Sequence, residues 1–272
     1  TKLDAEVIAA GTQLRIIGKH GVGTDNIDIP AATQRGVLVT NTPQANSTSV
    51  AEHALALLLA VARRIGESDR DLAAGKMRPQ KAYQGVELSG KTLGVIGLGS
   101  AGFRLARMGG QGLGMRVLGF DPYKSPWPDG IEPCREVAPL LAAADFISIH
   151  VPLTPDTRGL IGREALSTMK PSAVLVNTAR GGIVDEAALA EALRAGRIAG
   201  AGLDVVEDEP LQGHHPLNGV PNLVLTPHMA GVTAEAMMRM AQDSAEDIVQ
   251  VLRGERPRYP VNRDLLAGSG LR

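Results

Sequence analysis

Residues 97–102 read Gly97-Leu98-Gly99-Ser100-Ala101-Gly102, a glycine-rich stretch between an apolar run and a helical segment. The preceding run, Leu93-Gly94-Val95-Ile96, predicts a short buried strand, and the residues from Phe103 to Met108 predict a helix. A glycine-rich turn at such a junction lets the backbone approach a pyrophosphate and directs the helix N-terminus at its charge. The sequence therefore predicts a phosphate-binding turn in a doubly wound α/β domain.

The residue that follows the next strand narrows the choice of ligand. Residues 115–120 predict a second strand that ends at Asp121, about 20 residues beyond the last glycine of the turn. A carboxylate at this point can accept hydrogen bonds from both adenosine ribose hydroxyls and would repel a 2′-phosphate. A glycine pattern alone is a weak signal, but a strand, a helix and an acidic residue in register predict a dinucleotide site that prefers NAD to NADP.

Strands alternate with helices along most of the chain. This alternation predicts a parallel, doubly wound sheet whose ligands lie at the C-terminal ends of its strands. Expected strands span residues 14–18, 37–40, 93–96, 115–120, 146–149, 173–176, 199–205 and 223–225; expected helices span 29–35, 103–108, 138–143 and 186–195, with a further helix from Ser47 onward.

Composition restricts the class of protein. The chain has 272 residues, 44% of them hydrophobic, which is enough for one large or two ordinary domains. A net charge of −1 gives no basic field for nucleic acid, and 3% aromatic residues are too few for base stacking. The single Cys134 excludes an internal disulfide and suits a reducing compartment, while the longest apolar stretch, 54–62, is too short to span a membrane. We therefore expect a cytoplasmic protein with no nucleic-acid or membrane partner.

Three predicted strand ends carry groups suited to redox chemistry on a hydroxy acid: Arg180, Glu209 and His228. The planar guanidinium of Arg180 can hold a carboxylate through two parallel hydrogen bonds. A carboxylate beside an imidazole orients the ring and favours its protonated form. Hydride transfer to a ketone requires a proton for the developing alkoxide and a cation near the carbonyl. His228 and Arg180 are the candidates for these two roles.

Other polar residues have simpler interpretations. Glu207 and Asp208 are interpreted as solvent-facing loop residues, and Cys134, which no motif brackets, as a passive thiol. No histidine pair has the spacing of a metal site. Among the other histidines, we expect His20 and His53 to be structural or interdomain, His150 to cap a strand, and His214 and His215 to lie in a polar loop.

The segments that carry these residues resemble the D-isomer-specific 2-hydroxyacid dehydrogenase family, and the resemblance covers essentially the whole chain. Their occurrence in one order makes chance agreement negligible. The matching segments are Gly21-Val22-Gly23-Thr24-Asp25-Asn26-Ile27-Asp28, Val50-Ala51-Glu52-His53-Ala54, Gly90-Lys91-Thr92-Leu93-Gly94-Val95-Ile96-Gly97-Leu98-Gly99, Val176-Asn177-Thr178-Ala179-Arg180-Gly181-Gly182, Glu207-Asp208-Glu209-Pro210 and Thr226-Pro227-His228.

The resemblance implies a role for each matching residue. Arg180, Glu209 and His228 match the catalytic Arg–Glu–His set of the family. Val22 and Gly23 match the loop whose backbone amides hold the substrate carboxylate, so the implied substrate site consists of Val22, Gly23, Arg180 and His228. No metal is implied. The implied cofactor-binding residues are Gly97, Gly99, Ser100, Ala101, Gly102, Asp121, His150, Val151, Pro152, Thr157, Thr178, Ala179, Arg180, Asp204, His228 and Gly231.

The resemblance also implies an architecture of two similar α/β domains, Rossmann-like and flavodoxin-like, with doubly wound parallel sheets. We expect residues 1–40 and 229–272 to form the substrate domain, and residues 41–228 to form the NAD-binding Rossmann domain. Family members begin with several βα units that have no counterpart before Thr1. The N-terminal part of the substrate domain is therefore expected to be absent from the chain as given.

The activity that the resemblance implies is NAD-dependent interconversion of a D-2-hydroxy acid and its 2-keto acid. Residues 21–28 and 41–53 are most similar to the D-3-phosphoglycerate dehydrogenase branch, and hydroxypyruvate or glyoxylate reductase is the alternative. A formate dehydrogenase is less favoured, because that branch has glutamine where Glu209 stands. An NAD-sensing corepressor or scaffold is an alternative of another class, which the intact catalytic set disfavours. Met77 stands where relatives often carry Trp, so the identity of the hydroxy acid stays open.

The helix from Ser47 to Arg63 carries an apolar face made by Val50, Ala54, Leu57, Leu58 and Val61. This face is interpreted first as core. Its length and alanine content also suit packing across a two-fold axis, which the family resemblance implies. We therefore expect a homodimer.

Overall fold

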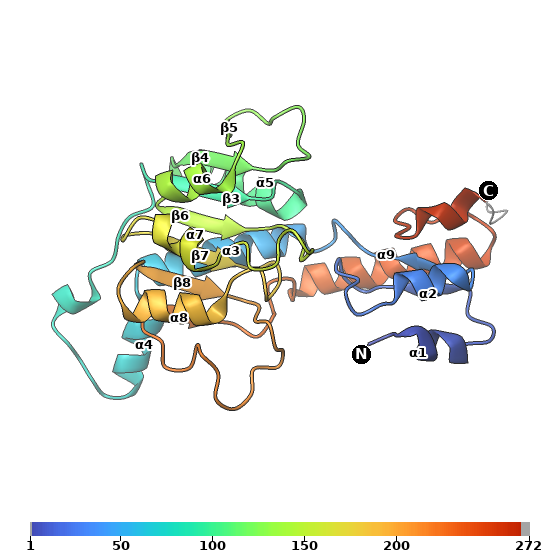
Figure 1. The fold of residues 1–272 in the computed structure, drawn as a ribbon, viewed down its shortest axis with the longest axis horizontal. Coiled ribbons are helices and arrows are strands. Elements are labelled where there is room, and N and C mark those ends of the chain that lie inside the picture. Colours follow the sequence, from blue (N-terminus) through green and yellow to red (C-terminus); the bar gives the residue numbers. More distant parts are fainter. Residues whose placement is uncertain (1, 268–272) are drawn as a thin grey trace. The chain divides into compact units, whose positions relative to one another are not determined.

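The computed structural model describes residues 2–267, and the chain separates into two compact units. The terminal unit contains the residues up to 49 and those from 231 onward, and the sheet unit contains residues 50–230. Figure 1 labels many of the elements in each unit.

The sheet unit contains seven parallel strands in the order β5-β4-β3-β6-β7-β8-β9. The chain runs outward from β3 toward one edge and then outward from β6 toward the other, so the order reverses between these two strands. Ligands of doubly wound sheets bind at such a switch point, beyond the carboxyl ends of the strands. The strands are β3 (Thr92–Ile96), β4 (Arg116–Phe120), β5 (Glu132–Pro133), β6 (Phe146–Ile149), β7 (Val174–Asn177), β8 (Gly200–Leu203) and β9 (Leu223–Leu225).

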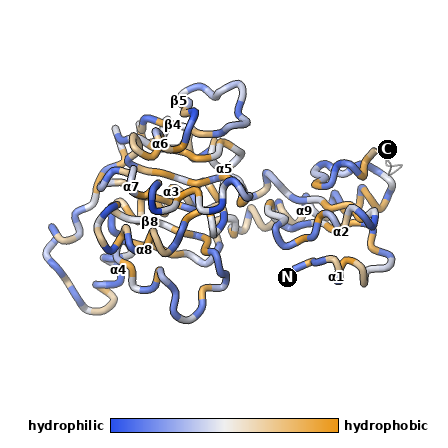
Figure 2. Tube along the Cα trace, viewed as in Figure 1, coloured by the Kyte–Doolittle hydropathy of each residue, from blue (hydrophilic) through white to orange (hydrophobic). Residues whose placement is uncertain are grey.

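Both faces of this sheet are covered by helices. Alternate residues of β7 show the pattern: Leu175 belongs to one core cluster, and Val174 and Val176 belong to the other. The first cluster includes residues of α6 (Val137–Ala143), α7 (Arg163–Thr168) and α8 (Glu186–Arg194). The second includes residues of α3 (Ser47–Ala62) and α5 (Ser100–Arg107). Strands buried on both faces contain little besides apolar residues, which is why they are drawn mainly orange in Figure 2.

The apolar face of α3 lies against the sheet of its own chain. Ala54 and Leu58 are completely buried and Leu57 is 2% exposed. The interpretation of this face as core is therefore confirmed, and its three central residues are not available to a partner. The following helix, α4 (Ile65–Ala73), contains no buried residue and exposes Ile65 and Leu72.

The terminal unit contains a parallel pair of strands, β1 (Ile16–Gly18) and β2 (Leu38–Thr40), rather than a complete doubly wound sheet. A small core that includes Ile8, Val37 and Val39 lies beside them. The remaining elements of this unit are α1 (Ala5–Ala10), α2 (Ile29–Gln34), α9 (Ala234–Leu252) and the 3₁₀ segment η3 (Arg263–Ala267).

Most expected elements are present, with shifts at their ends. Strands 146–149 and 223–225 have the expected bounds, whereas the strand expected at 199–205 is limited to 200–203. The expected helix 103–108 begins earlier, at Ser100, and a π-helical turn follows at 108–112. The long helix α9 was not expected. Within residues 2–267, no helix is both long and apolar enough to cross a membrane.

Candidate active site and cofactor site

The glycine-rich turn connects β3 to α5 at the switch point. Gly97 has φ +92°, which favours glycine, and a Cβ on Gly102 would lie 2.0 Å from the Gly97 carbonyl oxygen. The Asp121 carboxylate, at the end of β4, accepts a hydrogen bond from the Leu98 amide at 2.9 Å. Asp121 therefore fixes the turn.

Three observations in the sheet unit fit a bound dinucleotide. No side chain caps the N-terminus of α5, which begins at Ser100 and Ala101 after the N-cap Gly99. A Cβ added to Gly99 would meet no atom within 4 Å, so the space in front of the helix is open. The hydroxyl oxygen of Thr178, at the end of β7, is buried and has no hydrogen-bond partner, as expected of a group that awaits a ligand.

His150 follows β6 on the other side of the switch point. Its Nε2 lies 2.9 Å from the Ser148 hydroxyl. Burial lowers the pKa of His150 to about 4, so the ring is neutral near pH 7. The loop after it is tied by Thr157, whose hydroxyl donates to the Pro152 carbonyl at 2.6 Å. Val151 lies against the turn, because a Cβ on Gly97 would come within 2.9 Å of its side chain.

The loop that carries Arg180 is organised by Asn177, the last residue of β7. The Asn177 side chain accepts a hydrogen bond from the Ala179 amide at 3.0 Å and donates to the Arg180 carbonyl at 2.8 Å. Asn177 is 1% exposed, so burial and both contacts fix it in place. The Arg180 guanidinium donates to the Ala179 carbonyl at 2.7 Å and is thereby held near the strand end. The sequence quoted Asn177 only as part of a motif, although an Asn after a strand is a typical organiser of turns.

The turn after β9 is held by Asp204, which is 1% exposed. Its carboxylate accepts hydrogen bonds from the Thr226 hydroxyl at 2.6 Å and from the Met229 and Ala230 amides at 2.9 and 2.8 Å. Burial raises the pKa of Asp204, but hydrogen bonds from His53, Thr226 and these two amides outweigh it, and the pKa lies below its ordinary value. Asp204 is thus an anion that fixes the turn bearing His228.

His53 on α3 extends this network. Its Nε2 lies 3.0 Å from the Thr226 hydroxyl and 3.4 Å from the Asp204 carboxylate. The Thr226 hydroxyl donates to Asp204, so it accepts from His53. The expectation that His53 is structural agrees with these contacts, but its link to the turn could not be foreseen from sequence.

His228 and Glu209 meet directly. Nδ1 of His228 lies 2.6 Å from Oε2 of Glu209, and the other Glu209 oxygen accepts from the Val206 amide at 3.2 Å. The side chains of His228 and Glu209 are 48% and 36% exposed. Arg180, Glu209 and His228 follow β7, β8 and β9, three adjacent parallel strands, and therefore stand at one edge of the sheet.

The remaining predicted residues lie in the terminal unit. The loop at Val22 and Gly23 is held by Asn41, which donates to the Val22 carbonyl at 2.7 Å, and by Thr42, which accepts from the Gly21 amide at 3.1 Å. Within the described part of the chain, the amides of Val22 and Gly23 donate to no protein acceptor. Gly231 begins the second segment of this unit.

Among residues 2–267, no group of three or more His, Cys, Asp or Glu side chains could hold a metal ion. The arrangement in the sheet unit is that of a nucleotide-binding α/β protein with a His–carboxylate pair at the carboxyl ends of its strands.

Comparison with known proteins extends this class to a family. Residues 55–230 match the family model described as the D-isomer specific 2-hydroxyacid dehydrogenase, NAD binding domain. The chain belongs to the D-isomer specific 2-hydroxyacid dehydrogenase family, and its sheet unit carries the NAD-binding domain of that family.

Two curated relatives and one solved structure illustrate the similarity. The chain is 49% identical over 269 residues to a D-3-phosphoglycerate dehydrogenase of Archaeoglobus fulgidus, covering 96% of this chain and 50% of that protein. It is 44% identical over 271 residues to a glyoxylate reductase of Thermofilum pendens, covering 97% and 80%. The TT0316 protein of Thermus thermophilus superposes with a TM-score of 0.90 at 41% identity, covering 96% and 83%. The chain thus spans about half the length of the first of these relatives.

Proposed function

We propose that the protein is an NAD-dependent oxidoreductase that interconverts a D-2-hydroxy acid and its 2-keto acid, with D-3-phosphoglycerate as the best supported substrate. The observation that carries this proposal is the 2.6 Å contact between His228 and Glu209 at the carboxyl edge of an NAD-binding sheet. A histidine held by a carboxylate is a common general acid and base.

In the proposed reaction, the bound nicotinamide supplies or accepts the hydride. Nε2 of His228 donates a proton to the developing alkoxide during reduction and removes the hydroxyl proton during oxidation. Glu209 holds Nδ1 at 2.6 Å, which orients the ring. Arg180 holds the substrate by its carboxylate or carbonyl oxygen. Reduction therefore requires protonated His228, and oxidation requires the neutral ring.

The binding roles are proposed from the same geometry. The Val22 and Gly23 amides are assigned to the substrate carboxylate, because they have no protein acceptor within the described residues. We assign the pyrophosphate to the uncapped N-terminus of α5 and the ribose to Asp121. Further cofactor contacts are assigned to His150, Val151, Pro152, Thr157, Thr178, Ala179, Asp204 and Gly231.

Two relatives favour two substrates. The similarity to D-3-phosphoglycerate dehydrogenases supports that substrate, although the chain covers only 50% of the Archaeoglobus protein. The Thermofilum glyoxylate reductase supports glyoxylate or hydroxypyruvate as the second candidate, because the chain covers 80% of it.

A substrate panel tests both proposals. The protein, in its full natural length, is incubated with NADH and 3-phosphohydroxypyruvate, hydroxypyruvate or glyoxylate, and NADH consumption is followed. The first proposal predicts the highest kcat/KM for 3-phosphohydroxypyruvate. A highest value for either of the others transfers the assignment to a reductase, and no consumption with any keto acid contradicts the proposed activity.

The organisation of the molecule is proposed on the same basis. The terminal unit is assigned to the substrate domain and the sheet unit to the cofactor domain. The protein is proposed to be a cytoplasmic homodimer, since a lone cysteine needs no oxidising compartment and α4 exposes Ile65 and Leu72.

A further inference from the structure

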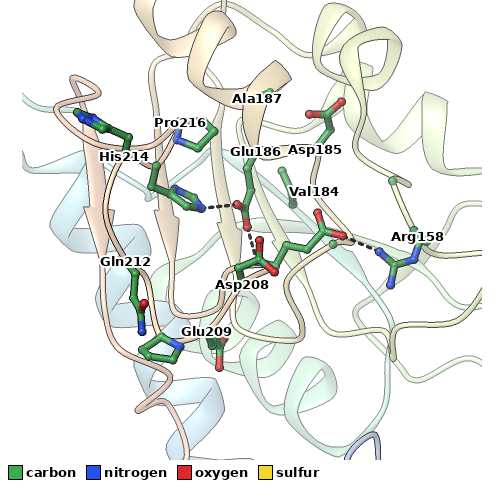
Figure 3. Close-up of a pocket in the computed structure, with 15 residues that line it drawn as sticks. Arg158, Val184, Asp185, Glu186, Ala187, Asp208, Glu209, Gln212, His214 and Pro216 are labelled. Atoms are coloured by element: carbon green, nitrogen blue, oxygen red, sulfur yellow. Dashed lines mark hydrogen bonds and ion pairs between the residues drawn. The ribbon is translucent and has the colours of Figure 1, made fainter.

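A pocket of about 930 Å³ lies behind the loop that carries Glu209. One side is formed by the first turn of α8, and the other by the loop at residues 207–216. Figure 3 shows Glu186 pointing from α8 into this pocket, toward the loop that carries Asp208 and Glu209. Glu209 is among the residues that line this pocket, and the assignments above place no ligand in it.

The two carboxylate oxygens of Glu186 contact the two ends of the loop. Oε1 accepts a hydrogen bond from the Glu207 amide at 2.7 Å, and Oε2 lies 3.0 Å from Nε2 of His215. The side chains of Glu186 and His215 are only 10% and 11% exposed. His215 lies in a loop between two strands, and its side chain is largely buried there against Glu186. Glu209 lies between the two ends that Glu186 holds.

The tautomer of His215 follows from its second contact. The Leu217 amide donates to Nδ1 of His215 at 3.3 Å, so Nδ1 carries no proton. The proton is then on Nε2, which donates to Glu186.

The peptide between Val206 and Glu207 connects this contact to the reacting groups. Its N–H donates the hydrogen bond that Oε1 of Glu186 accepts. A Cβ on Gly181 would lie 2.0 Å from its carbonyl carbon and oxygen, so the segment after Arg180 packs directly on the same peptide. The Val206 amide, one residue earlier, donates to Glu209.

A carboxylate in this place is costly. Burial raises the pKa of Glu186, and the negative charges of Glu207 and Asp208 raise it further, while the Glu207 amide and His215 oppose the shift. Arg158 pairs with Glu207 at 2.7 Å and offsets part of the local negative charge. Burying a charged group beside other acids is unfavourable unless it makes specific contacts, and here those contacts are with the Glu209 loop.

We propose that Glu186 is a positioning residue of the reaction, whose carboxylate holds both ends of the 207–215 loop and so keeps Glu209 against His228. This rests on the proposed function, because the role of Glu209 is defined by it. Glu186 contacts neither reacting group and acts through the loop.

Substitutions at the two ends of the contact test the proposal. Glu186→Gln keeps one acceptor oxygen but places an amide N–H against the Nε2–H of His215. His215→Leu removes the donor, whereas the side-chain amide of His215→Gln can donate from nearly the same position. Glu191→Gln is the matched control, because Glu191 lies on the same helix and pairs with Arg163 on the exposed surface.

Keto-acid reduction is measured for each variant. Glu186→Gln and His215→Leu are expected to lower kcat by roughly 10- to 100-fold, the effect of a misplaced catalytic group. The KM for NADH should be unchanged, and His215→Gln and Glu191→Gln should behave like wild type. A purely structural role would lower the melting temperature and leave kcat unchanged, which would overturn the proposal.

Amide hydrogen exchange at Glu207 supplies a readout that needs no turnover. Exchange should accelerate in Glu186→Gln and stay slow in Glu191→Gln. If exchange at the Glu207 amide is unchanged in Glu186→Gln, then Glu186 does not hold the loop, even if activity falls. Inactivity of the wild-type protein with every keto acid contradicts the proposed function and with it the positioning role, while the exchange result still decides whether Glu186 holds the loop.

Discussion

Glu209 and His228 are joined by one short contact of 2.6 Å, which orients the imidazole ring. Replacing Glu209 by Gln keeps the size of the side chain and removes its charge. Because the ring is then held less firmly, kcat for keto-acid reduction should fall in Glu209→Gln. His228→Ala should reduce turnover by roughly 10²- to 10⁴-fold, the usual effect of a positioned general acid, with NADH binding retained. Steady-state rates of both variants provide the check, and an unchanged kcat in Glu209→Gln would show that Glu209 does not position the donor.

Substituting Arg180 by Lys separates the effect of its positive charge from the effect of its planar hydrogen-bonding geometry. Lysine keeps the positive charge but lacks the planar fork that holds a carboxylate through two bonds. Binding of the keto acid should weaken by about 1.5–3 kcal/mol in Arg180→Lys, the value of a charged hydrogen bond, and NADH affinity should barely change. Calorimetric titration of each ligand measures both quantities. An equal loss for the two ligands would assign Arg180 to the fold or to the cofactor.

Asp121 accepts a hydrogen bond from the Leu98 amide and is proposed to bind the ribose, so one substitution should change both cofactor affinity and cofactor preference. Asp121→Ser removes the charge that repels a 2′-phosphate, so the preference for NADH over NADPH should narrow. The same change weakens the hold on the Leu98 amide, so NADH affinity itself should fall. Dissociation constants for both cofactors are compared with those of Asp129→Ser, in the same loop. Equal use of NADPH and NADH by the wild type would contradict this role.

At the level of elements, the end of β6 places a neutral histidine inside the cofactor domain. The pKa of His150 is lowered to about 4 by burial, whereas an unfolded chain takes up its proton near pH 6.5. Between these values the unfolded state binds more protons, so the free energy of unfolding falls as pH falls.

This loss should be on the order of 2 kcal/mol by about pH 5. Urea unfolding of wild type and His150→Gln near neutral pH and near pH 5 isolates the contribution, because the other titrating groups are common to both. The variant should lose less stability on acidification. Equal losses would mean that His150 is not held neutral.

The elements that could be predicted from the sequence are those in which buried apolar residues form a continuous or periodic pattern. The strands of the central sheet are buried on both faces, and residues 146–149 and 223–225 were predicted to the residue. Helix α9 was not predicted, because its buried side includes Ser244 and Asp247, which interrupt the apolar periodicity. Strand β5 consists of Glu132 and Pro133, two residues without strand propensity.

The candidate site was predictable where a motif marks it and unpredictable where distant residues meet. The sequence named Glu209 and His228, and the structure places them in contact. The contacts of Glu186 with His215, and of His53 with Thr226, join residues 29 and 173 positions apart, and no local pattern encodes them.

For the whole molecule, self-association is the open prediction. Because the central residues of the expected face on α3 are buried within the chain, a dimer must use other surfaces, and the exposed Ile65 and Leu72 of α4 are candidates. Light scattering at micromolar concentration should give twice the mass of one chain, and Leu72→Glu should reduce it, whereas Val7→Glu on the terminal unit should not. A stable monomer in the wild type would contradict the prediction.

The backbone of His228 has φ +51°, in the left-handed region that glycine adopts far more readily than residues with a side chain. The backbone conformation at residue 228 therefore favours glycine, whereas the proposed proton transfer requires histidine. The hydrogen bonds of Asp204 keep the turn in place despite this conflict. A laboratory selection for heat resistance alone would be expected to enrich glycine or asparagine at residue 228. The selected variants would be thermostable and would bind the cofactor, but they would not convert substrate. Such a selection therefore needs turnover as a second criterion.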